Sequence, residues 1–246
     1  MALGDSFTEG VGDPDSSLPN GVRGWADRFA EVLAGQADDF AYANLAIRGR
    51  KLLPIIDEQI EPALALEPDL VSIYAGANDV LRPRVDIDTL VAAYDKALRM
   101  LSDAGAHLVL FTAYDPGDSA IFGALRGRFA VYNELVRHVA DKYDATVVDF
   151  WRLREYRDDR MWDTDRMHMS SAGHQRMAIE VLNAVGIEHA LEPLPLDPKT
   201  PLSRAQQTAA NLDWAKTHAG PWVKRRLTGV SSGDNLSPRR PGLAPI

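Results

Sequence analysis

The sequence predicts an α/β fold in which helices cover both faces of a parallel sheet. Short apolar segments that are typical of buried strands alternate with longer segments in which apolar residues recur at helical spacing. The 246 residues are enough for one sizeable α/β domain with a short appendage. This alternation favours parallel strands that are joined by right-handed crossovers through the helices.

Five segments are expected to form the strands of this sheet. The third is the clearest, because it is a largely apolar run that ends at the turn-forming residues 75–79. The second also ends close to a glycine, Gly49. The expected strands are residues 1–5, 40–46, 70–74, 108–113 and 146–150.

Helices are expected after each of these strands. The second helix is interrupted by Pro54 and Pro62, because proline lacks the N–H that a helix interior needs. Ser170 or Ser171 can cap the last helix, because a serine side chain accepts a hydrogen bond from the first turn. The expected helices are residues 24–36, 51–66, 87–103, 121–142 and 171–185.

Residues 192–246 differ in composition from the rest, which indicates a domain over residues 1–191 and a C-terminal extension. Prolines break both ends of the extension, an amphipathic helix is expected at 203–218, and the tail after it is basic. The simplest interpretation is a solvated tail that packs on the acidic body. The alternative is an arm that closes over a site or joins two subunits, so a homo-oligomer could form through this extension.

Composition argues against several classes of function. The net charge of −8 argues against nucleic acid as a partner, because phosphate binding needs a clustered basic face. The chain has no cysteine, which excludes disulfides, thiolate metal ligands and cysteine nucleophiles. No apolar run approaches the length of a membrane helix, and we find no secretory signal. We therefore expect a cytoplasmic protein without stable membrane insertion.

Ser6 is the candidate nucleophile, because it lies between a short apolar lead and a loop rich in glycine, proline and aspartate. A serine hydroxyl is a weak nucleophile until an adjacent base takes its proton. His168 is the best candidate base, because the Asp165 carboxylate three residues earlier can accept its ring N–H and stabilise the imidazolium. Asp163 competes with Asp165 as the partner of the ring.

Acyl transfer also needs hydrogen-bond donors for an oxyanion. Gly49 offers a backbone N–H that no side chain blocks, Asn78 offers a side-chain NH₂, and the amide of Ser6 is a third donor. Ligands of parallel sheets bind beyond the carboxyl ends of the strands, so residues that follow the predicted strands should converge on one rim. These residues are Ser6, Gly49, Asn78, Asp115 and His168.

Four short blocks occur in order along the chain: Gly4-Asp5-Ser6, Gly49 after Asn44-Leu45-Ala46, Gly76-Ala77-Asn78-Asp79, and Asp165-Arg166-Met167-His168. Together they resemble the four blocks of the SGNH hydrolases, also called GDSL esterases and lipases, over about residues 1–188. The resemblance implies a flavodoxin-like three-layer α/β/α sandwich with a five-stranded parallel sheet, and it makes residues 1–191 the hydrolase domain. It also implies a catalytic triad of Ser6, Asp165 and His168 and an oxyanion hole of Ser6, Gly49 and Asn78.

We therefore expect a serine esterase that cleaves a small-molecule carboxylic ester through an acyl-enzyme, with no metal and no other cofactor. An acyltransferase on the same residues and a non-catalytic binding module of the same fold are the alternatives. A nucleotide or flavin binder is disfavoured, because the loop at Gly10-Val11-Gly12 lacks the residues of a phosphate-binding motif. No histidines or acidic residues have the spacing of metal ligands, and His174 is expected to be structural.

Substrate specificity is expected to depend on four loops, at residues 11–22, 80–86, 114–121 and 151–164. Four arginines flank Gly49 and Asn78 and could attract an anionic group, although exposed arginines are common: Arg48, Arg50, Arg82 and Arg84. Four aromatic residues could line an acyl or alcohol pocket, although large aromatics are more often core residues: Tyr114, Phe122, Trp151 and Trp162.

Overall fold

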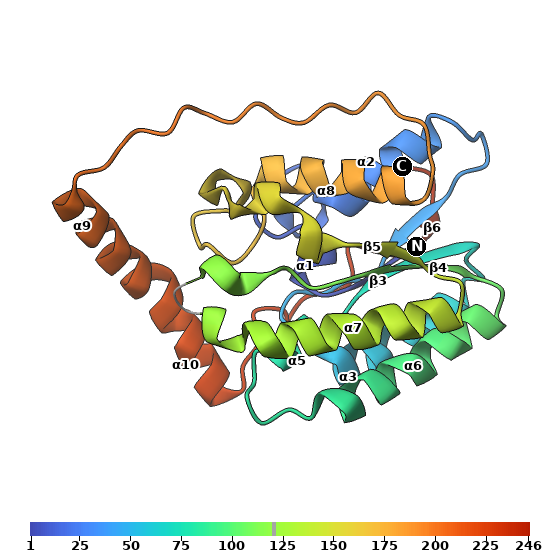
Figure 1. Ribbon diagram of the computed structural model, residues 1–246. Coiled ribbons are helices and arrows are strands. Elements are labelled where there is room, and N and C mark those ends of the chain that lie inside the picture. The colour runs from blue at the N-terminus through green and yellow to red at the C-terminus, as the bar shows by residue number, and fades with distance from the viewer. Residues whose placement is uncertain (120–121) are drawn as a thin grey trace.

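A sheet forms the centre of the computed structural model, which describes residues 1–119 and 122–246 (Figure 1). Its strands are β1 (Ala2–Gly4), β2 (Tyr42–Asn44), β3 (Leu70–Tyr74), β4 (His107–Phe111), β5 (Thr146–Val148) and β6 (Arg240–Ala244). They lie in the order β5-β4-β3-β1-β2-β6. The parallel strands β1 to β5 are those expected from the sequence, and they have the 2-1-3-4-5 order of flavodoxin-like folds.

Helices cover both faces of the sheet and make it the middle of three layers (Figure 1). One face carries α2 (Trp25–Ala34) and α8 (Ser171–Ala184), and the other carries α3 (Leu52–Ile55), α4 (Glu61–Leu64), α6 (Ile87–Asp103) and α7 (Arg126–Lys142). The short helices α1 (Ser6–Glu9) and α5 (Ala77–Val80) follow β1 and β3. Across the described ranges, no helix combines the length and the apolar character needed to cross a membrane.

Single turns of 3₁₀-helix occur in the connections. They are η1 (Pro19–Gly21), η3 (Pro116–Asp118), η4 (Gly123–Leu125), η5 (Phe150–Arg152), η6 (Arg154–Arg157) and η7 (Asp159–Met161). The last three lie in the loop between β5 and α8, where a 3₁₀ turn satisfies backbone groups without extending a helix. This loop therefore has a defined backbone on which site residues can be positioned.

Alternate residues of the central strands supply two separate cores. In β4, Leu108 and Leu110 belong to the core beneath α6 and α7, whereas Val109 and Phe111 belong to the core beneath α2 and α8. Successive side chains of a strand point to opposite faces, so a strand that is covered on both sides is apolar along its whole length. This burial explains why the central strands are visible in the sequence as continuous apolar runs.

The boundaries of the elements differ from the expected ones by a few residues in most cases. β3 and α6 cover residues 70–74 and 87–103 as predicted. The helix expected at 121–142 is α7, which begins at Arg126 after the 3₁₀ turn η4, and Ile121 lies outside the described residues. Predictions of this kind locate elements better than their ends, because helix termini depend on local caps.

The expected interruption at residues 51–66 is a local widening of the helix. Pro54 lies in the first turn of α3, where a backbone N–H has no partner within the helix. Ahead of Pro62, the helix widens to the π-helix η2 (Ile56–Ile60) before α4 begins. The wider turn lets the helical run continue through a residue that cannot donate the usual hydrogen bond.

The C-terminal arm, residues 192–246, passes around one end of the sandwich (Figure 1). Its helical part consists of α9 (Arg204–Trp214), the π-helix η8 (Ala215–Ala219) and α10 (Gly220–Thr228), so it extends well beyond the expected 203–218. A capping box between Ser203 and Gln206 begins this stretch, and Gly229 ends it in the left-handed conformation.

The last residues of the extension are packed on the body of the protein. Strand β6 pairs antiparallel with β2 at the edge of the sheet, with Tyr42 opposite Ala244 and Asn44 opposite Arg240. Just before this strand, Arg239 forms an ion pair with Asp27 of α2 in which both side chains are only 1% exposed. The last residues of the chain are therefore held to the body by strand pairing with β2 and by a buried ion pair with α2.

Candidate active site

All five predicted site residues line one cavity of about 780 Å³. Ser6 follows β1, Gly49 follows β2, Asn78 follows β3, and Asp165 and His168 lie in the loop between β5 and α8. The cavity therefore opens beyond the carboxyl ends of the parallel strands, where ligands of such sheets bind. Asp115, which was expected on the same rim, does not line the cavity and instead pairs with Arg126 and Arg154.

Ser6 is the first residue of α1, and the tight turn before it depends on Gly4. Gly4 has a φ of +139°, and a Cβ there would lie 2.4 Å from the Tyr74 carbonyl oxygen of β3. Asp5 caps α1 by accepting a hydrogen bond from the Phe7 N–H at 3.0 Å. Within the described residues, neither the Ser6 hydroxyl nor its backbone N–H has a protein partner, so both are available to a substrate.

His168 and Asp165 contact each other directly. The ring Nδ1 of His168 lies 2.5 Å from Asp165 Oδ2, while Asp165 Oδ1 accepts hydrogen bonds from the Met167 and His168 backbone N–H groups. Burial alone would raise the pKa of Asp165, but the His168 ring and these backbone donors hold it at about 2. The carboxylate is thus ionised beside the ring.

Asp163, the competing candidate, makes other hydrogen bonds. Asp163 donates its backbone N–H to the His168 carbonyl, and its carboxylate is paired with the Thr164 hydroxyl rather than with the ring. Arg166 turns the chain between Asp165 and His168 with a left-handed φ of 58°. This turn brings the Asp165 carboxylate into contact with the His168 imidazole, three residues later, although the segment is not helical.

Asn78 and Gly49, the proposed oxyanion donors beside Ser6, differ in their hydrogen bonds. Asn78 Nδ2 donates to Asp5 Oδ2 at 2.8 Å and to the Arg50 carbonyl at 3.1 Å, so both of its N–H groups have partners in the free protein. Burial raises the pKa of Asp5 to about 7, against the opposing effects of the Phe7 N–H and His168. Gly49 has a φ of +78°, and its N–H makes no hydrogen bond to any described residue.

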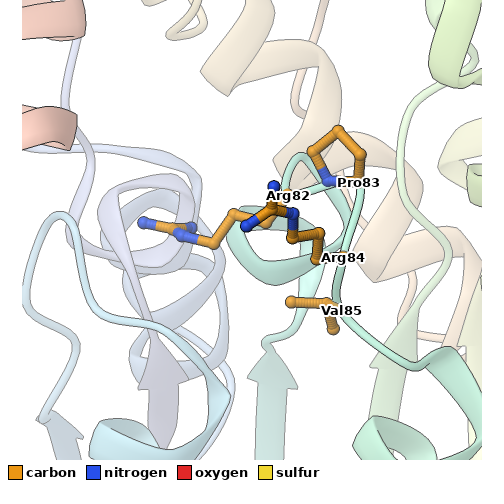
Figure 2. Close-up of a pocket in the computed structure, with 4 residues that line it drawn as sticks. All are labelled: Arg82, Pro83, Arg84 and Val85. Atoms are coloured by element: carbon orange, nitrogen blue, oxygen red, sulfur yellow. The ribbon is translucent and has the colours of Figure 1, made fainter.

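The four arginines near the rim have different roles. Arg48 pairs with the fully buried Glu9, and Arg50 pairs with Glu58 and with Asp234 of the arm. Arg82 lines the cavity and donates to the Asn78 carbonyl. Arg84 instead lines a second, open hollow of about 420 Å³, which it shares with Arg82. Figure 2 shows the Arg82 side chain extending away from this loop, with Pro83 on its other side.

The walls of the cavity are rich in aromatic side chains. Of the four aromatics that were proposed as lining residues, Tyr114, Phe122 and Trp162 line the cavity. Trp151 does not, and packs instead against the core and the Arg126 guanidinium. The sequence did not single out further aromatic lining residues, which are Phe7, Tyr74, Phe129, Phe150, Tyr156 and Trp222.

Each of the four predicted specificity loops reaches the cavity. The loop at 11–22 contributes Val11, the loop at 80–86 contributes Leu81 and Arg82, and the loop at 151–164 contributes four residues. In the loop at 114–121, Tyr114 and its neighbours line the cavity, while Ala120 and Ile121 lie outside the described residues. The longest contribution comes from the loop between β5 and α8, which also carries Asp165 and His168.

The C-terminal arm supplies one wall of the cavity. Lining residues of the arm come from η8 and α10 and from the segment after them: Thr217, His218, Pro221, Trp222, Arg225, Gly229, Val230, Ser231 and Ser232. Trp214 donates its indole N–H to the Asp165 carbonyl at 2.9 Å, and Arg166 stacks over the Trp214 ring at 5.0 Å. The arm therefore contacts the backbone that carries the carboxylate of the site.

The arm also covers Gly49. A Cβ at Gly49 would lie 2.1 Å from Ser231 Oγ, and Ser231 Oγ in turn donates to the Arg48 carbonyl at 3.3 Å. Glycine at position 49 is thus required both by its left-handed backbone and by the packing of the arm. Of the two interpretations of the extension, the contacts favour an arm that closes over the site.

The sequence model of the GDSL-like lipase/acylhydrolase family matches residues 2–176. The chain belongs to this family. It is 26% identical over 191 residues to the GDSL esterase/lipase WDL1 of Oryza sativa subsp. japonica, an alignment that covers 68% of this chain and 71% of that protein. Membership in the family makes the chain a carboxylic ester hydrolase.

Solved structures agree in fold. LAE5, an alpha/beta hydrolase enzyme from the metagenome of Lake Arreo in Spain, superposes with a TM-score of 0.61 at 24% identity and covers 75% of this chain and 93% of its own. Axe2, an acetylxylan esterase from Geobacillus stearothermophilus, gives a TM-score of 0.60 at 22% identity, with 76% and 93% covered. The family model ends at residue 176, so the arm that closes the cavity lies beyond it.

Proposed function

We propose that the chain hydrolyses small-molecule carboxylic esters through an acyl-enzyme formed on Ser6, with His168 as base and Asp165 as its orienting carboxylate. One observation carries the proposal: the His168 ring, bonded to an ionised Asp165, lines the same cavity as a Ser6 hydroxyl that has no partner among the described residues. Nucleophilic catalysis by serine requires the base to come within hydrogen-bond reach of the hydroxyl, a contact that can tighten when substrate binds.

In the acylation step, Nε2 of His168 takes the proton of the Ser6 hydroxyl as its oxygen attacks the ester carbonyl carbon. Asp165 accepts the Nδ1–H of the ring, fixes the tautomer that leaves Nε2 free, and stabilises the imidazolium. The imidazolium then gives its proton to the leaving alcohol. Water attacks the acyl-enzyme in the same way, and the carboxylic acid is released with Ser6 restored.

The oxyanion is held by the N–H groups of Ser6 and Gly49, which have no protein acceptor among the described residues. Asn78 is the third donor, and the oxyanion competes with the Arg50 carbonyl for one of its two N–H groups. The other N–H stays with Asp5, which holds the amide at the site. Donors that are fixed before the reaction stabilise developing charge without reorganisation, and each is worth about 10²–10³-fold in rate.

Acyl transfer to an alcohol uses the same residues and differs only in the acceptor. The aromatic walls and the covering arm favour this second activity, because they limit the access of water to the acyl-enzyme. The ratio of new ester to free acid, measured in the presence of an added alcohol, gives the share of acyl transfer relative to hydrolysis.

Hydrolysis of p-nitrophenyl esters of increasing acyl length tests the proposal. Ser6→Ala and His168→Ala are expected to lose activity by about 10³-fold or more, because the triad acts as a unit. Ser17→Ala and His107→Ala are the matched controls, since both residues are exposed and neither lines the cavity. Hydrolysis that survives in Ser6→Ala, or is absent from the wild-type protein, would contradict the serine mechanism.

A further inference from the structure

The cavity is basic although the protein is acidic. The chain has a net charge of −8, yet the ionisable side chains that line the cavity include Lys51, Arg82, Arg157, Arg166 and Arg225. Among the side chains that the structure describes, three acidic residues line it: Asp5, Asp159 and Asp165. Such a local excess of positive charge in an acidic protein attracts anions to one place on its surface.

None of the three acidic residues forms an ion pair with Lys51, Arg82 or Arg225 in the described part of the chain. Asp165 is paired with His168, and Asp159 is paired with Lys199 at 2.6 Å. Asp5 is buried and already accepts hydrogen bonds from Phe7 and Asn78, and burial raises its pKa to about 7. Two of the three carboxylates are thus paired with other side chains, and the third has a raised pKa because it is buried.

Three of the cations form no ion pair with a carboxylate in the part of the chain that the structure describes, although the charges of Lys51 and Arg82 act on the buried Asp79. Lys51 lies just before α3, Arg82 lies in the loop after α5, and Arg225 lies on α10 of the arm. Arg82 donates only to the Asn78 carbonyl, which leaves most of its N–H groups unused beside a proposed oxyanion donor. By contrast, the neighbouring Arg48 and Arg50 are paired with carboxylates.

The hollow in Figure 2 continues the basic surface. It shares Arg82 with the main cavity, and Arg84 lines its other side. Arg84 is exposed and, among the described residues, has no carboxylate partner either. Arginine side chains recognise carboxylates by paired, charge-assisted hydrogen bonds, so this rim suits an anionic group better than a neutral one.

We propose that the site selects esters that carry a carboxylate close to the scissile bond, with Arg82 as the principal contact and Lys51 and Arg225 as supporting cations. The inference rests on the proposed esterase function and names its substrate class. The carboxylate can belong to the acyl half, as in a half-ester of a dicarboxylic acid, or to the alcohol half. Arg82 is a specificity residue in this account and takes no part in the bond-breaking steps.

Two matched pairs of esters test the proposal and separate the two halves. Mono-4-nitrophenyl succinate against 4-nitrophenyl butyrate places the carboxylate in the acyl half, and 4-acetoxybenzoate against phenyl acetate places it in the alcohol half. We expect the wild-type protein to favour the anionic member of at least one pair in kcat/KM by about tenfold, the size of one charge-assisted contact. The preference should shrink between 0.05 and 0.5 M salt, because exposed charges are screened.

Arg82→Gln should reduce that preference by about fivefold or more, and Arg225→Gln and Lys51→Gln should reduce it by less. Arg99→Gln is the control, because it removes the same charge from an exposed site on α6 that does not line the cavity. A wild-type ratio of kcat/KM, anionic over neutral ester, that is near or below one in both pairs would overturn the inference, and so would a ratio that Arg82→Gln leaves unchanged. In either case, hydrolysis of the neutral esters would still support the esterase function. Absence of hydrolysis of all four esters would instead contradict the proposed function.

Discussion

His168 and His174 lie close together in the sequence, yet their surroundings give them different roles. His168 is partly exposed to the cavity and bonded to a carboxylate. His174 is fully buried in α8, where its Nδ1 accepts from the Trp25 N–H and its Nε2 donates to the Val11 carbonyl. Burial lowers the pKa of His174 to about 4. It is therefore a neutral, structural residue that joins the loop after α1 to the start of α2.

This difference predicts a pH-dependent stability for His174. Between pH 4 and the ordinary histidine value of 6.5, the unfolded chain binds a proton at this residue and the folded chain does not, so stability falls as the pH falls. The advantage of the wild-type protein over His174→Gln in the free energy of unfolding should shrink by about 2 kcal/mol from pH 7.5 to pH 5. Urea titrations at both pH values measure it.

The stability of the wild-type protein is compared with that of His174→Gln because the titration of Asp5 changes stability with pH in the opposite direction. Burial raises the pKa of Asp5 to about 7, which makes the folded state less stable as the pH rises through this range, and this effect is common to both proteins. His107→Gln, at an exposed position, should show no such change relative to the wild-type protein. A difference between wild type and His174→Gln that stays constant with pH would refute the assignment.

Among the contacts between single residues, the sequence predicted those between residues that are close together in the chain. Asp165 and His168 are three residues apart, so their pairing follows from a single turn. The pairing of Asn78 with Asp5 spans 73 residues, and that of Arg48 with Glu9 spans 39, so neither has a local signal. Arg48 and Arg50, two of the four arginines that could attract an anionic group, are paired with carboxylates that the fold brings near them.

At the scale of elements, strands β1 to β5 were predictable and β6 was not. The strand β6 has the sequence Arg-Pro-Gly-Leu-Ala, which lacks the β-branched residues of a typical strand and contains both Pro241 and Gly242. Proline is tolerated at a sheet edge, because one side of an edge strand needs no N–H donor. The position of β6 beside β2 thus explains a strand that its own composition would exclude.

The buried ion pair between Arg239 and Asp27 is expected to hold this strand. Removing one partner leaves an uncompensated charge in the interior, so Arg239→Met should lower the free energy of unfolding by about 3–5 kcal/mol in urea titrations. The double variant Asp27→Leu with Arg239→Met should lose less, because apolar side chains can replace a buried pair.

A neighbouring arginine provides the control for this anchor. Arg240 lies 3.6 Å from the other Asp27 oxygen but is more exposed, so Arg240→Met should cost about 1 kcal/mol or less. If Arg239→Met were as stable as the wild-type protein, or if the double variant were less stable than the single one, the pair would not be the anchor of the C-terminal arm.

At the scale of the whole molecule, the site is assembled from segments that are distant in the sequence. The carboxyl ends of β1, β2 and β3 and the loop after β5 converge because the strands are parallel, which the alternation of strands and helices predicted. The closing of the arm over this rim was one of two interpretations left open by the sequence, because an amphipathic helix does not specify the surface that it covers. Likewise, a net charge of −8 gave no sign of a basic cavity.

The central claim is that Ser6 is the residue that carries the acyl group, and covalent labelling tests it most directly. The purified protein would be incubated with a fluorophosphonate and its intact mass measured, beside Ser6→Ala and the exposed control Ser17→Ala. We predict one adduct per chain in the wild-type protein and in Ser17→Ala, located on the peptide that contains Ser6, and none in Ser6→Ala. An unlabelled wild-type protein, or an adduct that persists in Ser6→Ala, would contradict the account.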